Sequence, residues 1–118
     1  MITIELHGGH IPSEGNVYVN GKPVCDDEWD EDDAAVACPN AWVITIYKLV
    51  PNYLLTFSYS SGVSTTNSRF GPVPSMFIFD GVKCVGTEHS LYDCPFAMKG
   101  TCGSYEGAGV ICSGRKHQ

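Results

Sequence analysis

The densest group of chemically active side chains in this sequence is the stretch from Val24 to Cys38, VCDDEWDEDDAAVAC. Two of the six cysteines bracket seven of the thirteen acidic residues in this stretch. Carboxylate oxygens are the ligands that the hard cations Ca²⁺ and Mg²⁺ prefer. We therefore interpret the stretch as a candidate cation-binding region. Its acidic residues are Asp26, Asp27, Glu28, Asp30, Glu31, Asp32 and Asp33.

Two familiar metal motifs are excluded by spacing. An EF-hand loop starting at Asp26 needs glycine at its sixth position and glutamate at its twelfth, where this chain has Glu31 and Ala37. Successive cysteines lie 13, 46, 10, 8 and 10 positions apart, so no CxxC pair is present to hold a tetrahedral zinc ion. A cation site must therefore be assembled from distant residues. This predicts weak binding, in the extracellular range of roughly 10⁻⁴ to 10⁻³ M.

A catalytic site is not expected. Ser90, His89 and Asp93 match a nucleophile, a base and an orienting acid by type, but adjacent residues seldom face one another productively. The other histidines have no clustered partner. We therefore predict that the protein is not an enzyme.

Length and composition predict a single extracellular domain. A chain of 118 residues has room for one core. Six cysteines are many for a cytosolic protein and predict three disulfides in an oxidising compartment. The alternative is reduced, buried thiols. The sequence alone leaves fifteen ways to pair the six cysteines. The net charge of −6 and the scattered basic residues argue against direct binding of nucleic acid or other polyanions. The most apolar segment, 41–57, is interrupted by Lys48, Pro51 and Asn52, which argues against a membrane span, and no signal-peptide pattern is present.

The acidic stretch is expected to lie between strands and a short helix. Asn20-Gly21 predicts a hairpin turn after a strand at 16–19. Asp30 is the predicted N-cap of a helix whose acidic first turn suits the helix dipole, and Pro39 should end that helix at Cys38. Alternation and apolar runs predict further strands at 2–6, 22–25, 76–79 and 107–112, with a tail or linker from 114 to 118.

The segment 41–68 is the least regular part of the chain. Residues 42–47 and 53–57 are interpreted as two strands joined by Pro51-Asn52, and residues 58–68 as a polar loop. Its aromatic residues either pack over the sheet or form an exposed apolar patch for a partner. Those residues are Trp42, Tyr47, Tyr53, Phe57 and Tyr59, whereas Trp29 is expected in the core.

Four stretches together resemble a known family. In chain order they are EGNVYV, VCDDEWDEDDAAVAC, FGPVPSMFIFDGVKCVGTEHSLYDCP and CGSYEGAGVIC. They resemble the scavenger receptor cysteine-rich (SRCR) domain of the six-cysteine, group A type. The resemblance implies a small disulfide-bonded α+β domain over residues 1–113, in which a curved antiparallel β-sheet cradles one α-helix, here with a long atypical insertion at 41–68. It also implies the disulfide pairs Cys25–Cys102, Cys38–Cys112 and Cys84–Cys94.

The resemblance also implies site residues. Asp26, Asp27 and Glu106 match a divalent-cation site of the family, and the Cys25–Cys102 bridge is expected to bring these acids together. Asp33, with Asp80 as a neighbour, resembles part of a second site in some members. The chain departs from the family pattern at positions 39–42, where PNAW replaces an Arg-Gln-Leu-Gly-like turn, at 22–23, where Lys-Pro replaces Trp-Gly, and at positions 81 and 107, where glycines replace two family acids.

The function that the resemblance implies is an extracellular, non-enzymatic binding module, secreted or part of an ectodomain. Weakly bound Ca²⁺ or Mg²⁺ would allow this acidic domain to recognise polyanions such as lipopolysaccharide, sulfated polysaccharides or modified lipoproteins. The alternative is a protein–protein interaction domain of a receptor ectodomain or secreted mosaic protein, with segment 41–68 as its contact surface. Direct nucleic-acid binding and membrane insertion by this domain are not expected, and the specific ligand and oligomeric state are left open.

Overall fold

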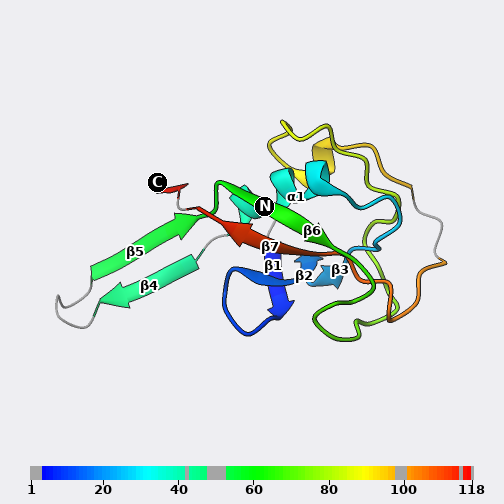
Figure 1. The fold of residues 1–118 in the computed structure, drawn as a ribbon, viewed down its shortest axis with the longest axis horizontal. Coiled ribbons are helices and arrows are strands. Elements are labelled where there is room, and N and C mark those ends of the chain that lie inside the picture. The colour runs from blue at the N-terminus through cyan, green and yellow to red at the C-terminus, as the bar shows by residue number, and fades with distance from the viewer. Residues whose placement is uncertain (1–3, 42, 48–52, 98–100, 115, 118) are drawn as a thin grey trace.

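The computed structural model describes residues 4–41, 43–47, 53–97, 101–114 and 116–117. Figure 1 shows a body built from helical turns and short strands, and a hairpin arm that extends from it. The whole chain measures 49 × 28 × 24 Å along its principal axes. No helix in the described part of the chain has the length and apolar character that a membrane span requires.

Two antiparallel sheets make up the β-structure. The main sheet has the order β1-β2-β7-β6, with the short strand β3 paired to β2, and the second sheet has the order β4-β5-β8. The strands are β1 (Ile4–Gly8), β2 (Glu14–Val19), β3 (Lys22–Pro23), β4 (Val43–Tyr47), β5 (Tyr53–Ser58), β6 (Ser61–Thr65), β7 (Gly109–Ser113) and β8 (Lys116–His117). One α-helix, α1 (Glu31–Ala37), and two 3₁₀ helices, η1 (Cys38–Asn40) and η2 (Leu91–Asp93), complete the described elements.

The predicted hairpin and helix signals are confirmed. Asn20 and Gly21 connect β2 to β3 with positive φ angles of 49° and 84°, which glycine and asparagine tolerate better than other residues. Asp30 caps α1 by accepting hydrogen bonds from the backbone amides of Asp32 and Asp33, and the Asp33 side chain accepts a hydrogen bond from the amide of Asp30. Pro39 stands at the start of η1, so the α-helix ends just before it.

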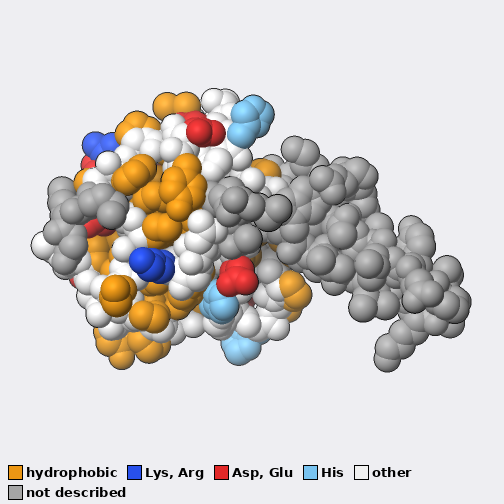
Figure 2. Space-filling view, turned by 180° about the vertical axis from the view of Figure 1, so that it is seen from behind, with side chains coloured by type: hydrophobic (Ala, Val, Ile, Leu, Met, Phe, Trp, Pro, Cys, Tyr) orange, Lys and Arg blue, Asp and Glu red, His pale blue; other side chains and the backbone are white. Residues whose placement is uncertain are grey.

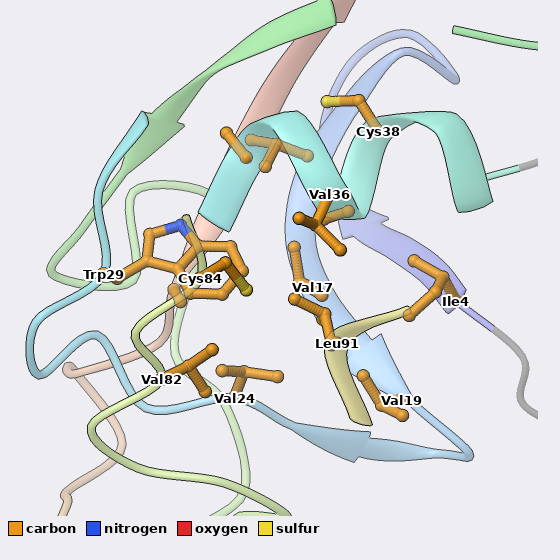
Figure 3. Packing of buried hydrophobic residues seen from close by; sticks show 14 of the residues in the cluster. Ile4, Val17, Val19, Val24, Trp29, Val36, Cys38, Val82, Cys84 and Leu91 are labelled. Carbon is orange, nitrogen blue, oxygen red and sulfur yellow. The ribbon is translucent and has the colours of Figure 1, made fainter. Parts of the chain in front are cut away.

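The core lies between the main sheet, α1 and the loops that follow Phe79 (Figure 3). Val17 and Val19 face inward from β2, and Val36 faces them from the helix. Trp29 is also buried, as predicted, and its Nε1 donates a 2.9 Å hydrogen bond to the carbonyl of Gly109. Apolar packing therefore joins the helix to the sheet, and a buried polar contact joins the sheet to the segment just before the helix.

Three disulfides fasten the domain: Cys25–Cys102, Cys38–Cys112 and Cys84–Cys94. These are the pairs that the family resemblance implies. The first two close long loops, with sequence separations of 77 and 74 residues, and the third closes a loop of 10. Together with the antiparallel sheet and the single helix, they confirm the small disulfide-bonded α+β fold.

Two predicted elements are wrong. Residues 61–65, predicted as part of a polar loop, form β6, which pairs with β7 from Ser61↔Ser113 to Thr65↔Gly109. The prediction failed because serine, threonine and glycine give this strand no apolar alternation. Residues 76–79, predicted as a strand, have irregular backbone, with Phe79 in a single parallel bridge to Val24.

The segment 41–57 contains two strands, as predicted. β4 and β5 pair in antiparallel register from Val43↔Phe57 to Tyr47↔Tyr53, and β5 also pairs with β8 near the chain's end. In Figure 1 this hairpin arm projects away from the body. Part of the expected 114–118 tail, Lys116–His117, is thus a strand of the second sheet. Of the aromatic set, Tyr59 is buried, and the other four side chains lie outside the described residues.

Candidate functional site

The first two acids of the acidic stretch are placed by a backbone ladder as well as by a disulfide. The amide of Asp26 donates a 2.8 Å hydrogen bond to the carbonyl of Glu106. One residue earlier, Cys25 forms an antiparallel bridge with Gly107, and the Cys25–Cys102 disulfide closes the same region. Segments 24–26 and 106–108 therefore lie side by side although eighty residues separate them.

Glu106 closes its own turn. Its Oε1 accepts a 2.9 Å hydrogen bond from the amide of Gly103, and its amide donates a bond of the same length to the carbonyl of Gly103. The carboxylate is half-buried and fixed on one side.

Asp27 and Glu106 are the carboxylates that the structure brings together. One oxygen of each lies within 4.8 Å of the other and of the sulfurs of Cys25 and Cys102. Asp27 Oδ2 is 3.9 Å from the sulfur of Cys102. Since both sulfurs belong to a disulfide, neither is a thiolate ligand, and the donor set consists of oxygen. This set fits a hard divalent cation that completes its coordination with water or ligand oxygens.

Asp26 stands beside this pair rather than within it. Its Oδ2 accepts a short, 2.6 Å hydrogen bond from the amide of Asn67. Burial is the main cause that raises the pKa of Asp26, and the nearby charges of Glu106 and Asp27 raise it further, while the Asn67 amide opposes the shift. The charges of Glu106 and Asp27 thus repel that of Asp26, and a bound cation would relieve this repulsion.

A loop that the sequence did not connect with the site holds it in place. Asn67 and Ser68 both have positive φ angles, 57° and 49°, which are uncommon for residues other than glycine. Ser68 Oγ donates to the carbonyl of Ser104 at 2.7 Å and accepts from the amide of Gly107 at 2.8 Å. These contacts join the 67–68 turn to both sides of Glu106. The only sequence signal was turn-forming residues in a polar segment, which gives no partner.

The structure does not bring Asp33 and Asp80 to this cluster. Asp33 is fully buried, and its two oxygens accept backbone hydrogen bonds from Cys84 (2.8 Å) and Asp30 (2.9 Å). Asp80 is buried as well, and its backbone pairs with Ala97. Within the described residues, neither acid belongs to a group of three potential metal ligands. Asp33 acts as an internal acceptor that ties α1 to the Cys84 loop.

The residues that resemble a catalytic set have other roles. Ser90 Oγ accepts a 3.2 Å hydrogen bond from the amide of Tyr92 and so caps η2. His89 and Asp93 are exposed. A further group, Cys84, Glu88 and Cys94, consists of a disulfide and a carboxylate that already accepts bonds from three backbone amides.

The basic residues are dispersed in the described part of the chain. Lys83 Nζ forms a 2.8 Å ion pair with Glu28, and Arg69 lies with its guanidinium 5.9 Å from the ring centroid of Phe70. On the face shown in Figure 2, Lys and Arg side chains stand apart from one another and form no continuous basic surface. Lys99 and Arg115 lie outside the described residues.

Known proteins show the same domain. The mouse macrophage receptor MARCO is 32% identical over 114 residues, which cover 93% of this chain and 18% of that receptor. A scavenger receptor cysteine-rich domain superfamily protein of Patiria pectinifera is 37% identical over 116 residues, which cover 93% of this chain and 9% of that protein. The chain thus spans less than one fifth of the length of either relative.

Solved structures agree with the fold. The third SRCR domain of murine neurotrypsin superposes with a TM-score of 0.74 at 31% identity, over 97% of this chain and 98% of that domain. The dimeric form of the SRCR domain of mouse MARCO gives a TM-score of 0.61 at 33% identity, over 92% and 93% of the two chains. The family model described as "Scavenger receptor cysteine-rich domain" matches residues 7–113. On this match, on its relatives and on its fold, the chain belongs to the scavenger receptor cysteine-rich domain family.

Proposed function

We propose that this SRCR domain is an extracellular, non-enzymatic binding module that recognises polyanions through a divalent cation. The observation that carries the proposal is the approach of Asp27 and Glu106 to within 4.8 Å, beside Asp26. Three disulfides in a chain of six cysteines support assignment to the group A type and to an oxidising, extracellular location, either secreted or in an ectodomain.

The protein supplies the negatively charged ligands of the cation site. Asp27 and Glu106 would hold Ca²⁺ or Mg²⁺, and Asp26 adds charge from the side while its position is fixed by Asn67. A divalent cation bound there supplies the positive charge that receives a sulfate, phosphate or carboxylate group of the ligand. This accounts for polyanion binding by a domain with net charge −6 and without a continuous basic surface on the face of Figure 2.

The ligand class follows from this chemistry. Lipopolysaccharide, sulfated polysaccharides and modified lipoproteins all carry closely spaced anionic groups. Two protein carboxylates hold a cation weakly, so a single site should have low affinity. Several domains that act together would raise the overall affinity, because the second binding event becomes intramolecular.

Calorimetric titration with Ca²⁺ tests the cation site. The wild-type protein should give binding heats that Asp27→Ala abolishes, whereas Asp93→Ala, an exposed acid outside the cluster, should leave them unchanged. Binding to an immobilised sulfated polysaccharide should be lost in EDTA and restored by excess Ca²⁺. Equal heats for wild type and Asp27→Ala would refute the site, and binding that survives EDTA would point to direct contacts by Arg69, Lys83 or Lys99.

A second candidate function is protein–protein recognition through the 41–68 segment. The observation that favours it is the hairpin β4–β5, which projects from the body as a separate arm (Figure 1). The SRCR domain of mouse MARCO has been solved in a dimeric form, so a protein partner or a second copy belongs to this proposal. Deletion of residues 43–57 would then abolish binding to the partner, and EDTA would not.

A further inference from the structure

The turn that carries Glu106 also presents an exposed aromatic ring. Tyr105 precedes Glu106 directly, and 70% of its surface is accessible to solvent. Most other aromatic side chains with described positions pack on neighbours: Tyr92 and Phe96, for example, lie with ring centroids 5.0 Å and 4.6 Å from that of Phe79. Within the described residues, Tyr105 has no comparable ring contact.

The backbone on both sides of Tyr105 is fixed. The amide of Val73 donates a 2.9 Å hydrogen bond to the carbonyl of Ser104, which also accepts from Ser68 Oγ. On the other side, Glu106 and Gly103 bond each other through the backbone and through the Glu106 carboxylate. A tyrosine side chain has two χ angles to order, so a ring on such a fixed turn costs little entropy when a ligand covers it.

The residues that flank Tyr105 in the chain are small or polar. Gly103 and Ser104 precede it and are half-buried, Thr101 is exposed, and the half-buried Glu106 follows it. A single flat ring with polar neighbours suits a ligand that is itself hydrophilic but has one apolar face. A pyranose ring has this character, because its axial C–H groups form an apolar face and its hydroxyl groups surround it.

We propose that Tyr105 is a stacking platform for a sugar ring, and that the preferred ligand is an anionic saccharide. The inference rests on the proposed function, since the sulfate or carboxylate of the same sugar would bind at the cation held by Asp27 and Glu106. The sugar ring would then lie on Tyr105, one residue away in the chain. Polyanions without sugar rings gain nothing from Tyr105, so the residue selects saccharides from other anionic ligands.

The test compares two probes with the intact protein in the presence of Ca²⁺: dextran sulfate, which has sugar rings, and inorganic polyphosphate, which has none. Tyr105→Ala should weaken dextran sulfate binding by about two- to tenfold, the range expected for loss of one aromatic contact. Tyr105→Phe should retain the wild-type affinity because it retains the ring. Val85→Ala, at an equally exposed apolar position in the Cys84–Cys94 loop (71% accessible), is the matched control and should change neither probe.

Three results would overturn the inference: equal dextran sulfate affinity for wild type and Tyr105→Ala, equal losses for both probes, or reduced Ca²⁺ heats in Tyr105→Ala. The last would mean that Tyr105 only positions Glu106. A different result would refute the proposed function, namely binding of both probes that EDTA does not reduce. In that case the comparison of Tyr105→Ala with wild type would still test whether Tyr105 contacts the sugar ring. A wild-type protein that binds neither probe would refute both.

Discussion

The amide of Cys84 donates a 2.8 Å hydrogen bond to Oδ1 of Asp33, across 51 positions of the chain. Asp33 Oδ2 accepts a second bond from the amide of Asp30, so one buried carboxylate joins the start of α1 to the loop of the third disulfide. The acid thus serves the fold rather than a surface site. Its burial raises the pKa of Asp33 to about 7, despite the two amide donors.

The raised pKa of Asp33 predicts that stability depends on pH near neutrality. An acid whose pKa is higher in the folded state stabilises the fold below its unfolded pKa and loses this contribution as the pH rises through the folded pKa. The free energy of unfolding should therefore fall between pH values of about 4 and 7, and Asp33→Asn should show a smaller fall. Urea denaturation across this range measures it. Asp32→Asn, at the exposed neighbouring position, should keep the wild-type slope, and an unchanged slope in Asp33→Asn would contradict the assignment.

Asp26→Asn should have opposite effects on stability and on cation binding. Burial and the charges of Glu106 and Asp27 raise the pKa of Asp26, so at neutral pH its ionised form opposes folding when no cation is bound. Removal of this charge should raise the melting temperature in EDTA. It should also reduce the increase that Ca²⁺ produces, because the site loses negative charge. A variant that is less stable in EDTA would indicate that the Asn67 hydrogen bond outweighs the repulsion.

The two kinds of disulfide should differ in their effect on the site. Replacement of Cys25 and Cys102 by serine should cost about 4.5 kcal/mol in the chain-entropy description, since the closed loop is long. It should also weaken Ca²⁺ binding, because this bridge lies against Asp27 and fastens the segment that carries Glu106.

Replacement of Cys84 and Cys94 is the matched control for that experiment. The shorter loop predicts a cost of about 3 kcal/mol. This bridge is separate from the acidic pair, so Ca²⁺ heats should persist in the folded fraction. Denaturant titration and calorimetry on both double variants measure the two effects, and equal loss of Ca²⁺ binding in both would argue that the site depends only on global stability.

The parts of the fold that could be predicted from the sequence are those that local signals determine. Asp30 before an acidic turn, Pro39 after an apolar run and Asn20-Gly21 between alternating strands each act within a few residues, and the structure has the predicted helix and hairpin there. β6 was missed because its residues are polar, and their strand conformation depends on pairing with β7. Such pairing leaves no local pattern in the sequence.

The candidate site could also be predicted only in part from the sequence. The positions of Asp26 and Asp27 next to a cysteine, together with the family resemblance, pointed to Glu106, and the structure places Glu106 beside them. Asn67 and Ser68 were not predictable, because they act through a backbone amide and a hydroxyl on an unusual turn. Asp33 was ambiguous in sequence because an N-terminal helix acid and a buried acceptor have the same residue type.

Gly109 should be among the least replaceable residues in the sheet. A Cβ atom at this position would contact Thr65 Oγ1, the carbonyl oxygen of Gly15 at 2.8 Å and Asn16 Oδ1 at 3.2 Å, all within the buried part of β2, β6 and β7. Backbone and buried side chains cannot move aside easily, so Gly109→Ala should lower the free energy of unfolding by about 1–3 kcal/mol. Guanidinium denaturation measures this change.

Gly103→Ala is the matched control for Gly109→Ala. Among the described residues, its Cβ would meet only Glu106 Oε1, at an ordinary contact distance of 3.5 Å, so the stability of this variant should stay close to that of the wild type. Equal destabilisation by the two variants would contradict crowding between β6 and β7 as the reason that position 109 requires glycine. A large loss confined to Gly109→Ala would instead locate the constraint at the strand pair that the sequence alone did not reveal.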